Sequence, residues 1–305
     1  MAFNWQTFKT RTLTAIIFVV VMLAGLLINR WTFLTLFSII HFGCWWEYLK
    51  LTEKIYNTKI DIAIKYVLMS IGFVLFLLIG FPNDTMYVGS KDGSFNFKWL
   101  FYLFIIICIA AIFFQNKKIP LRAKWLLALG FIYISLSLGL LISLYAKQRY
   151  SFGDQISTTD IHLHDTVFVV PPYFYPASII ASLWINDTMA YIIGSLIGKT
   201  QMSKISPKKT WEGTIGGIVL SIVVIFLLSY FVFHFGILSY ALMILAAIVS
   251  ITGTFGDLLE SKLKRMANVK DSGHIMPGHG GFLDRFDSLL IATPFVWVYV
   301  YFFLQ

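Results

Sequence analysis

The sequence of 305 residues has little charge and almost no cysteine. Charged residues make up 13% of the chain, whereas a soluble domain has about 25%. Both cysteines, Cys44 and Cys108, lie in apolar stretches. They exclude a disulfide framework and a thiolate metal cluster, and we expect them to be packing residues. In contrast, 58% of the residues are hydrophobic and 17% aromatic, and this composition predicts an integral membrane protein.

Long apolar runs account for most of the chain. Helices that cross the hydrocarbon core of a membrane need about 17–25 apolar residues. Nine runs of this kind lie near 13–29, 31–49, 62–81, 99–115, 123–146, 175–197, 214–236, 238–256 and 287–304. We therefore predict an all-α, polytopic protein with about nine transmembrane helices. Only Asn29-Arg30 separates the first two runs, so these runs are either a tight helical hairpin or one re-entrant feature.

The distribution of basic residues predicts the orientation. With the N-terminus inside, 19 of the 24 Lys and Arg residues fall in the inner segments, as the positive-inside rule requires. We expect an N-in, C-out protein with two regions. Residues 1–174 would hold about five transmembrane helices and an outer loop, and residues 175–305 about four helices with cytosolic active-site loops. The net charge of +9 favours anionic headgroups or anionic substrates as partners, and we expect no nucleic acid partner.

Acidic residues gather in the last 120 residues of the chain, where seven of the 15 lie between Asp187 and Asp287. Asp187 lies inside an apolar run, where a charged side chain costs about 2.5–3.5 kcal/mol. It is either paired for structural reasons with a neighbouring helix or part of a functional site, and we favour the site.

The end of the eighth apolar run combines charges on one face. At helical spacing Asp257, Glu260, Ser261 and Lys264 are neighbours. This face could bind a cation together with a phosphate. It could equally be the amphipathic end of a helix with an i,i+4 ion pair.

A glycine-rich segment follows. Gly278, Gly280 and Gly281 allow backbone N–H groups to approach a bound group closely, and the last helix begins directly after them with an N-terminus that favours anions. Asp284 and Asp287 lie at i and i+3 on that helix. A segment with so many charges and glycines indicates a functional site.

The ligand types indicate which metal this site would hold. Carboxylate oxygens without thiolates favour Mg²⁺, which takes one or two carboxylates together with substrate phosphates. Zinc bound through His274 and His279 is the weaker alternative, because the sequence offers no closed ligand set. His279 fits better as a phosphate-contacting donor or a proton-transfer group.

A third element precedes the seventh apolar run. Ser206 and Pro207 fit the N-cap and the first position of a helix. Lys208 and Lys209 would then lie in its first turn, beside free N–H groups that suit a polyphosphate.

Together these segments resemble the phosphatidate cytidylyltransferase (CDP-diacylglycerol synthase) family. Residues Ser261 to Asp287 fill every fixed position of the family signature S-x-x-K-R-x4-K-D-x-G-x5-H-G-G-x2-D-R-x-D. The Asp187 segment and residues 206–213 agree as well, and the clear resemblance covers about 180–290. Two positions depart from the usual pattern: Met276 replaces another apolar residue, and Ser195 stands where a basic residue is common.

The resemblance implies an Mg²⁺-dependent enzyme that joins CTP to phosphatidic acid, giving CDP-diacylglycerol and pyrophosphate in phospholipid biosynthesis. It also implies a multi-pass homodimer in the cytoplasmic membrane, with its active site on the cytosolic face. The expected metal ligands are Asp257, Asp284 and Asp287. The residues expected to contact the substrates are Asp187, Lys208, Lys209, Ser261, Lys264, Arg265, Lys270, Asp271, His279, Gly280, Gly281 and Arg285.

Other classes of membrane protein fit parts of this pattern. A related lipid enzyme with another acceptor, such as a lipid-alcohol kinase or an isoprenoid-ether cytidylyltransferase, could use the same ligands. A transporter would account for Asp187, but it would spread its charges along a pathway instead of gathering them at one face.

Overall fold

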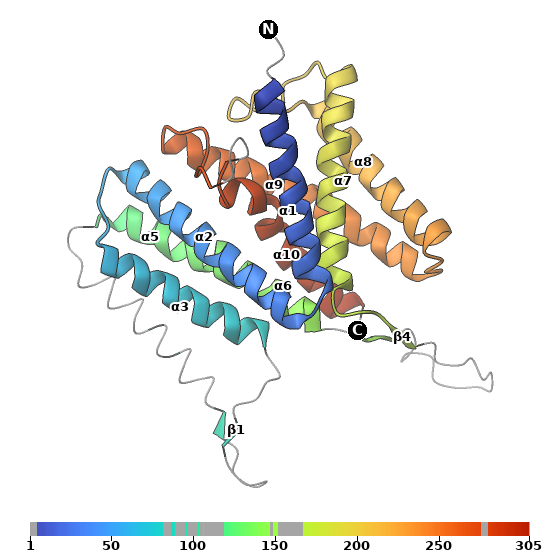
Figure 1. The fold of residues 1–305 in the computed structure, drawn as a ribbon, viewed down its shortest axis with the longest axis horizontal. Coiled ribbons are helices and arrows are strands. Elements are labelled where there is room, and N and C mark those ends of the chain that lie inside the picture. The colour runs from blue at the N-terminus through green and yellow to red at the C-terminus, as the bar shows by residue number, and fades with distance from the viewer. Residues whose placement is uncertain are drawn as a thin grey trace. The chain divides into compact units, whose positions relative to one another are not determined.

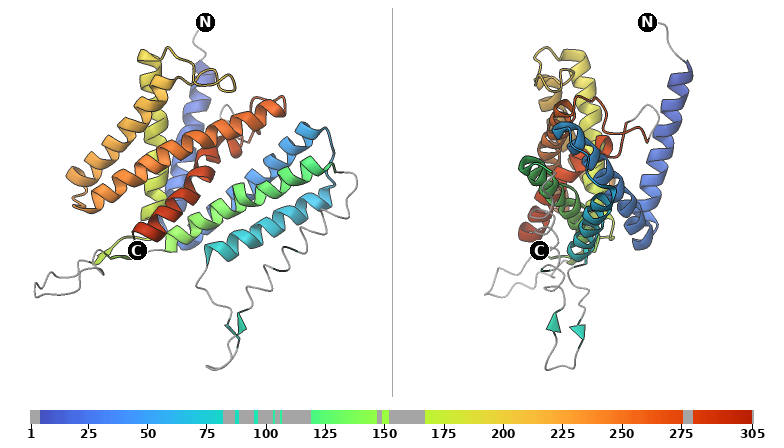
Figure 2. Two further views of the ribbon diagram at one scale, coloured as in Figure 1. Left: turned by 180° about the vertical axis from the view of Figure 1, so that it is seen from behind. Right: turned by 90° about the vertical axis from the view of Figure 1, so that its left-hand side faces the viewer.

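The computed structural model is helical apart from four short strands (Figures 1 and 2). It describes residues 5–81, 87–88, 95–96, 103, 106, 119–146, 149–151, 167–275 and 280–304. Cys108, His279 and most of the predicted run 99–115 lie outside these residues. The chain forms two compact units. The first comprises Met1–Ser143 and Leu259–Asp287, and the second Leu144–Leu258 and Ser288–Gln305.

The N-terminal part of the first unit begins with two separate helices. These are α1 (Trp5–Leu27) and α2 (Arg30–Tyr56). The two apolar runs are a helical hairpin and not one re-entrant feature. Asn29 is the N-cap of the second helix, because its side chain accepts hydrogen bonds from the N–H groups of Trp31 and Thr32. The Thr32 hydroxyl in turn accepts from the Asn29 N–H, which completes a capping box and starts α2 anew.

The other helices of this unit lie alongside α2. They are α3 (Ile62–Gly80), α5 (Leu121–Gly130), the π-helix η1 (Phe131–Leu136) and the first part of α6 (Ser137–Ala146). Figure 1 shows α2, α3 and α5 side by side, and contacts join α2 to α3 and α5, and α3 to η1. The strands β1 (Tyr87–Val88) and β2 (Phe95–Asn96) pair antiparallel.

Trp45 of α2 is fully buried at the centre of this unit. Its indole N–H donates to the hydroxyl of Ser135 at 2.9 Å, and His41 Nε2 lies 3.0 Å from the same oxygen. Gly72 and Gly130 leave room for the ring, since a Cβ on either would lie within 3.0 Å of Trp45 atoms. Cys44 is also buried, as expected of a packing residue.

The second unit begins with the antiparallel strands β3 (Arg149–Ser151) and β4 (Val167–Val169). Its helices are α7 (Phe174–Ile197), α8 (Trp211–Leu227) with the π-helix η2 (Leu228–Val232), α9 (Leu238–Met266) and α10 (Leu283–Phe303). The ends of α9 and α10 that carry residues 259–266 and 283–287 belong to the first unit.

Small residues allow α7 and α8 to approach closely. A Cβ on Gly217 would lie 2.7 Å from the Cβ of Ala190, and one on Gly213 would lie 2.8 Å from the Gly194 Cα. Glycine is therefore required at this crossing.

Six helices in the described part of the chain are long and apolar enough to cross a membrane: Ile62–Gly80, Leu121–Tyr145, Phe174–Ile197, Trp211–Val232, Leu238–Met266 and Leu283–Phe303. The shorter apolar helix Thr12–Leu27 accompanies them. The prediction of a helical, polytopic membrane protein is confirmed. The number of nine spans, the orientation and the division at residue 174 stay predictions.

Candidate functional site

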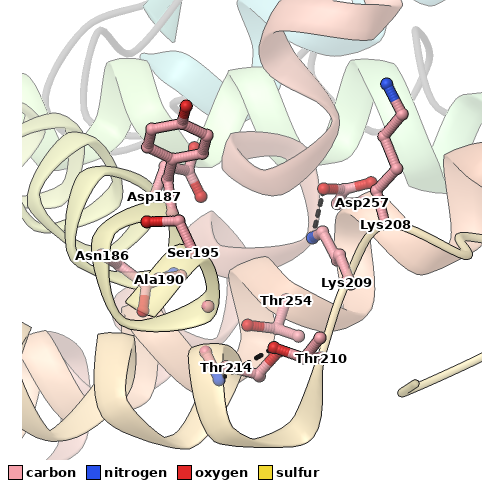
Figure 3. Close-up of a pocket in the computed structure, with 13 residues that line it drawn as sticks. Asn186, Asp187, Ala190, Ser195, Lys208, Lys209, Thr210, Thr214, Thr254 and Asp257 are labelled. Atoms are coloured by element: carbon pink, nitrogen blue, oxygen red, sulfur yellow. Dashed lines mark hydrogen bonds and ion pairs between the residues drawn. The ribbon is translucent and has the colours of Figure 1, made fainter. Parts of the chain in front are cut away.

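A pocket of about 370 Å³ lies within the second unit (Figure 3). Its wall is formed by α7, the segment before α8, the first turn of α8 and one face of α9. The residues that line it are Asn186, Asp187, Ala190, Tyr191, Gly194, Ser195, Lys208, Lys209, Thr210, Gly213, Thr214, Thr254 and Asp257. Four of these are site residues that the sequence predicts: Asp187, Lys208, Lys209 and Asp257.

The helix behind the two lysines begins later than predicted. Ser206 is not an N-cap, because Ser206 and Pro207 form a turn in which the Lys209 N–H donates to the Ser206 carbonyl at 3.1 Å. The N-cap is Thr210, whose hydroxyl accepts from the Gly213 N–H at 3.1 Å. Proline suits the second position of such a turn as well as the first position of a helix. Lys208 and Lys209 therefore precede α8 instead of lying in its first turn.

Hydrogen bonds fix the segment 199–210, which carries the two lysines, against the start of α8. The Glu212 carboxylate accepts from the N–H groups of Lys199 and Thr200 at 3.1–3.2 Å. The Met202 N–H donates to the Lys209 carbonyl at 2.9 Å, and an antiparallel bridge joins Gln201 to Thr210. These bonds hold Lys209 at the edge of the pocket.

Opposite charges meet at one side of the pocket. Lys209 forms an ion pair with Asp257, and Figure 3 shows the two side chains pointing toward each other. Each side chain retains about 30% of its surface exposed, so an incoming anion can reach the ammonium and an incoming cation can reach the carboxylate. Lys208 is exposed and adds a second positive charge.

The α7 side of the pocket presents polar groups within an otherwise apolar helix. Asn186 is buried, and its Oδ1 has no hydrogen-bond partner among the described residues. Asp187, which the sequence places in an apolar run, is exposed and lines the pocket. An unpaired buried acceptor is costly, and a bound group that donates a hydrogen bond to Asn186 would remove this cost.

A second cluster of site residues lies within the first unit, centred on Lys264. Its ammonium lies 2.5 Å from Glu260 Oε2 and 2.7 Å from Asp284 Oδ1. All three side chains are largely buried, with exposed fractions of 14% for Lys264, 1% for Glu260 and 9% for Asp284. The predicted i,i+4 ion pair at the end of α9 is thus present, and it extends to the signature segment.

Backbone and side-chain donors of the signature segment surround the other oxygen of Asp284. Oδ2 accepts from the Gly281 N–H at 2.7 Å and from the N–H and hydroxyl of Ser272, both at 2.9 Å. Gly280 adopts a φ of +86°, and a Cβ there would lie 2.5 Å from Asp284 Oδ2. The close approach expected of these glycines therefore brings the backbone to a carboxylate of the protein itself.

The remaining predicted residues divide by burial. Ser261 and Asp287 are buried, whereas Arg265, Lys270, Asp271 and Arg285 are exposed. These four charged side chains of the signature are thus accessible to a soluble ligand. Asp257, however, belongs to the second unit and Asp284 to the first.

The chemistry of the buried groups in the first unit fits a cation. Four buried or largely buried carboxylates, those of Glu47, Glu260, Asp284 and Asp287, accompany the ammonium of Lys264. Glu260 Oε1 has no hydrogen-bond partner among the described residues. Carboxylate oxygens are the ligand type that Mg²⁺ takes, although the Lys264 ammonium and N–H groups of the signature segment already donate to Asp284 and Glu47. Within the described residues, no three His, Cys, Asp or Glu side chains are already arranged to hold a metal ion.

The model of the cytidylyltransferase family matches residues 9–303. The chain belongs to this family. Phosphatidate cytidylyltransferase of Staphylococcus saprophyticus is 39% identical over 184 residues, which cover 57% of this chain and 67% of the relative. The enzymes of the same name from Staphylococcus haemolyticus and Staphylococcus aureus are 38% and 37% identical, with the same coverage.

The cytidylyltransferase family match also covers the N-terminal half, where sequence reasoning found only apolar runs. It includes Glu47, a buried carboxylate of α2 that accepts hydrogen bonds from the signature segment. Sequence reasoning missed this residue, although an acidic residue inside an apolar run was the signal that had drawn attention to Asp187.

Proposed function

We propose that this chain is a membrane enzyme that joins CTP to phosphatidate, giving CDP-diacylglycerol and pyrophosphate. The observation that carries the proposal is the signature segment 261–287, in which Lys264 links two buried carboxylates and the surrounding backbone donates to Asp284. The family match and the relatives named phosphatidate cytidylyltransferase support the same reaction.

The reaction is a phosphoryl-centre substitution. An oxygen of the phosphatidate phosphate attacks the α-phosphorus of CTP, a new P–O bond forms, and the bond to the β-phosphate breaks. Pyrophosphate leaves with the electron pair of that bond. Positioning and neutralisation of charge can supply most of the catalysis in such a reaction.

The pocket of the second unit suits the polyphosphate of CTP. Lys208 and Lys209 bring two positive charges to its edge, and phosphate oxygens could replace Asp257 as the partner of Lys209. Asn186 and Asp187 line the same pocket on α7 and offer acceptors, which suit hydrogen-bond donors of the ligand and not its phosphate oxygens. On the signature segment, the exposed side chains of Arg265, Lys270 and Arg285 could contact further phosphates of either substrate.

The metal of the proposal is Mg²⁺, and its proposed ligands are the three carboxylates that the sequence predicts, those of Asp257, Asp284 and Asp287. Bound there, it would neutralise the negative charge that develops on the phosphates and orient them for attack. Lys264 holds Asp284 Oδ1 in place, and the donors of Ser272 and Gly281 hold Oδ2.

The membrane setting of the proposal is the cytoplasmic membrane of a cell. We infer about nine spans, an N-in and C-out orientation, an active site on the cytosolic face where CTP is available, and a homodimer. The six helices suited to a membrane support the membrane setting, and the bias of Lys and Arg toward one set of loops supports the orientation. The homodimer is proposed from the family resemblance. Phosphatidate could then reach the site laterally, with its acyl chains still in the bilayer.

The experiment measures CDP-lipid formation from labelled CTP by the purified chain in detergent with phosphatidate. The Asp284→Asn variant should lose about 100-fold or more of the turnover, because an amide is a poor Mg²⁺ ligand. Asp61→Asn is the matched control. Asp61 caps α3 through the Ala63 N–H, and Asn caps helices as well as Asp does.

Two results would overturn parts of the proposal. Normal turnover by Asp284→Asn would remove Asp284 from the metal site. Formation of a CDP-lipid from an isoprenoid ether, or of a phosphorylated lipid alcohol, in place of product from phosphatidate would assign the chain to another acceptor.

A further inference from the structure

Glu47 is a buried carboxylate in the N-terminal half of the chain. It lies in α2 with 5% of its surface exposed, and the signature resemblance assigns it no role. A buried carboxylate is stable only when donors satisfy its oxygens. The role of Glu47 can therefore be inferred from the groups that donate hydrogen bonds to it.

All of these donors come from the signature segment of the same unit. Glu47 Oε1 accepts from the Phe282 N–H at 2.9 Å, and Oε2 accepts from the Leu283 N–H at 2.9 Å. These N–H groups lie at the start of α10, where they have no acceptor within the helix. Glu47 therefore caps α10 from a different helix, and its negative charge faces the positive end of the α10 dipole.

The glycines of the signature leave room for this carboxylate. A Cβ on Gly273 would lie 2.2 Å from Glu47 Oε1, and one on Gly281 would lie 2.3 Å from both oxygens. Two glycines of the segment thus approach the same carboxylate closely. Because these two glycines lack a side chain, the Glu47 carboxylate fits beside them.

Ser272 connects Glu47 to Asp284. Its hydroxyl lies 2.7 Å from Glu47 Oε2 and 2.9 Å from Asp284 Oδ2. A hydroxyl has one proton, so it donates fully to only one carboxylate at a time. The two carboxylates also hold consecutive N–H groups, those of residues 281–283. A change at Glu47 therefore alters the position and the hydrogen bonding of Asp284.

We propose that Glu47 is a positioning residue of the reaction, which holds the start of α10 and, through Ser272, orients the Asp284 carboxylate for its cation. The inference rests on the proposed function for its kinetic consequence. Outer-shell partners of metal ligands alter metal affinity or activity by about 10–100-fold when they are replaced.

The test compares Glu47→Gln with the wild-type chain in purified form. Gln has the same size, but its NH2 group must face either the Phe282 or the Leu283 N–H, so one hydrogen bond becomes a clash of donors. We expect kcat to fall about tenfold or more and the Mg²⁺ concentration for half-maximal rate to rise about threefold or more. Glu53→Gln is the control. Glu53 also lies on α2, pairs with Lys65 at 2.7 Å and accepts from the Ile60 N–H, and its variant should keep the wild-type Mg²⁺ requirement.

Two outcomes would overturn the inference: a folded Glu47→Gln variant with wild-type kinetics, or one with lower kcat and an unchanged Mg²⁺ requirement, which would leave Glu47 a structural role only. If Glu47→Gln does not fold, Ser272→Ala takes its place. It removes only the hydroxyl link, and it must raise the Mg²⁺ requirement if Ser272 transmits the effect of Glu47.

A stability cycle tests the geometry without any turnover. Gly281→Ala should lower the Tm of the wild-type chain in detergent, because the added Cβ collides with Glu47. In a Glu47→Ala background the same change should lower the Tm much less, since the carboxylate is gone. Equal losses in both backgrounds would refute the contact. A wild-type chain that forms no CDP-lipid but shows this coupling would refute the proposed function and leave the packing role of Glu47 intact.

Discussion

Lys264 lies between two buried carboxylates of the first unit, and its removal gives the most direct prediction. The ammonium lies 2.5 Å from Glu260 Oε2 and 2.7 Å from Asp284 Oδ1. Lys264→Met keeps the length and most of the volume of the side chain but leaves both carboxylates without this partner. Breaking a buried ion pair from one side costs about 3–5 kcal/mol. We therefore expect the free energy of unfolding to fall by this amount and turnover to be lost.

The loss of stability should be largely recoverable at Glu260. Asp284 retains its donors from Ser272 and Gly281 when Lys264 is removed, whereas neither oxygen of Glu260 has another hydrogen-bond partner among the described residues. Most of the cost should therefore come from Glu260. The double variant Glu260→Gln/Lys264→Met should regain at least about half of the lost stability, while turnover stays low because Asp284 still lacks its ammonium.

Equilibrium unfolding in mixed detergent micelles measures these free energies, and labelled CTP measures turnover. A Lys264→Met variant as stable as the wild type would refute the view that the ammonium neutralises buried charge. A double variant no more stable than the single one would show that the cost does not arise at Glu260.

Two further predictions concern the pocket and the core. Lys209→Met should raise the KM for CTP about tenfold or more, since an ionic contact to a phosphate is worth about 1.5–3 kcal/mol; Lys204→Met, an exposed lysine of the same segment outside the pocket, should leave it unchanged, and equal KM values for both variants would contradict this role. Ser135→Ala should lower the free energy of unfolding by about 1–3 kcal/mol, because the buried Trp45 N–H loses its acceptor. A thermal melt of the Ser135→Ala variant that matches the wild type would refute that cost.

The helices were predictable because a membrane leaves the chain few alternatives. Backbone groups in hydrocarbon must be satisfied within the segment, so each long apolar run in the described part of the chain became a helix. The break at Asn29 was marked by its polar residue, but the sequence could not decide between two helices and one feature. The capping box with Thr32 decides it.

The predicted start of α8, at Ser206, was wrong because the Ser-Pro pair is an ambiguous signal. Ser-Pro fits the beginning of a helix and the beginning of a turn equally well. The choice depends on the Thr210 side chain and on the bridge between Gln201 and Thr210, and a pairing of that kind is not visible in local propensity.

Contacts between residues close in sequence were the predictable ones. Glu260 and Lys264 lie at i and i+4 on one helix, so their ion pair was one of the two interpretations of that helix end. The contact of Lys264 with Asp284, 20 positions further along the chain, was not predicted. Glu47 is separated from Leu283 by 236 positions. Nothing near Glu47 in the sequence indicates that its carboxylate accepts from the N–H groups of Phe282 and Leu283. Only the fold could reveal this contact.

The capping of α10 by Glu47 means that the signature is not a portable module. A fragment that starts after α2 would retain all 27 residues from Ser261 to Asp287, yet the N–H groups of Phe282 and Leu283 would lack their acceptor, and the space beside Gly273 and Gly281 would be left unfilled. Grafting the segment onto another helical scaffold would fail for the same reason, unless a carboxylate were supplied there from a neighbouring helix.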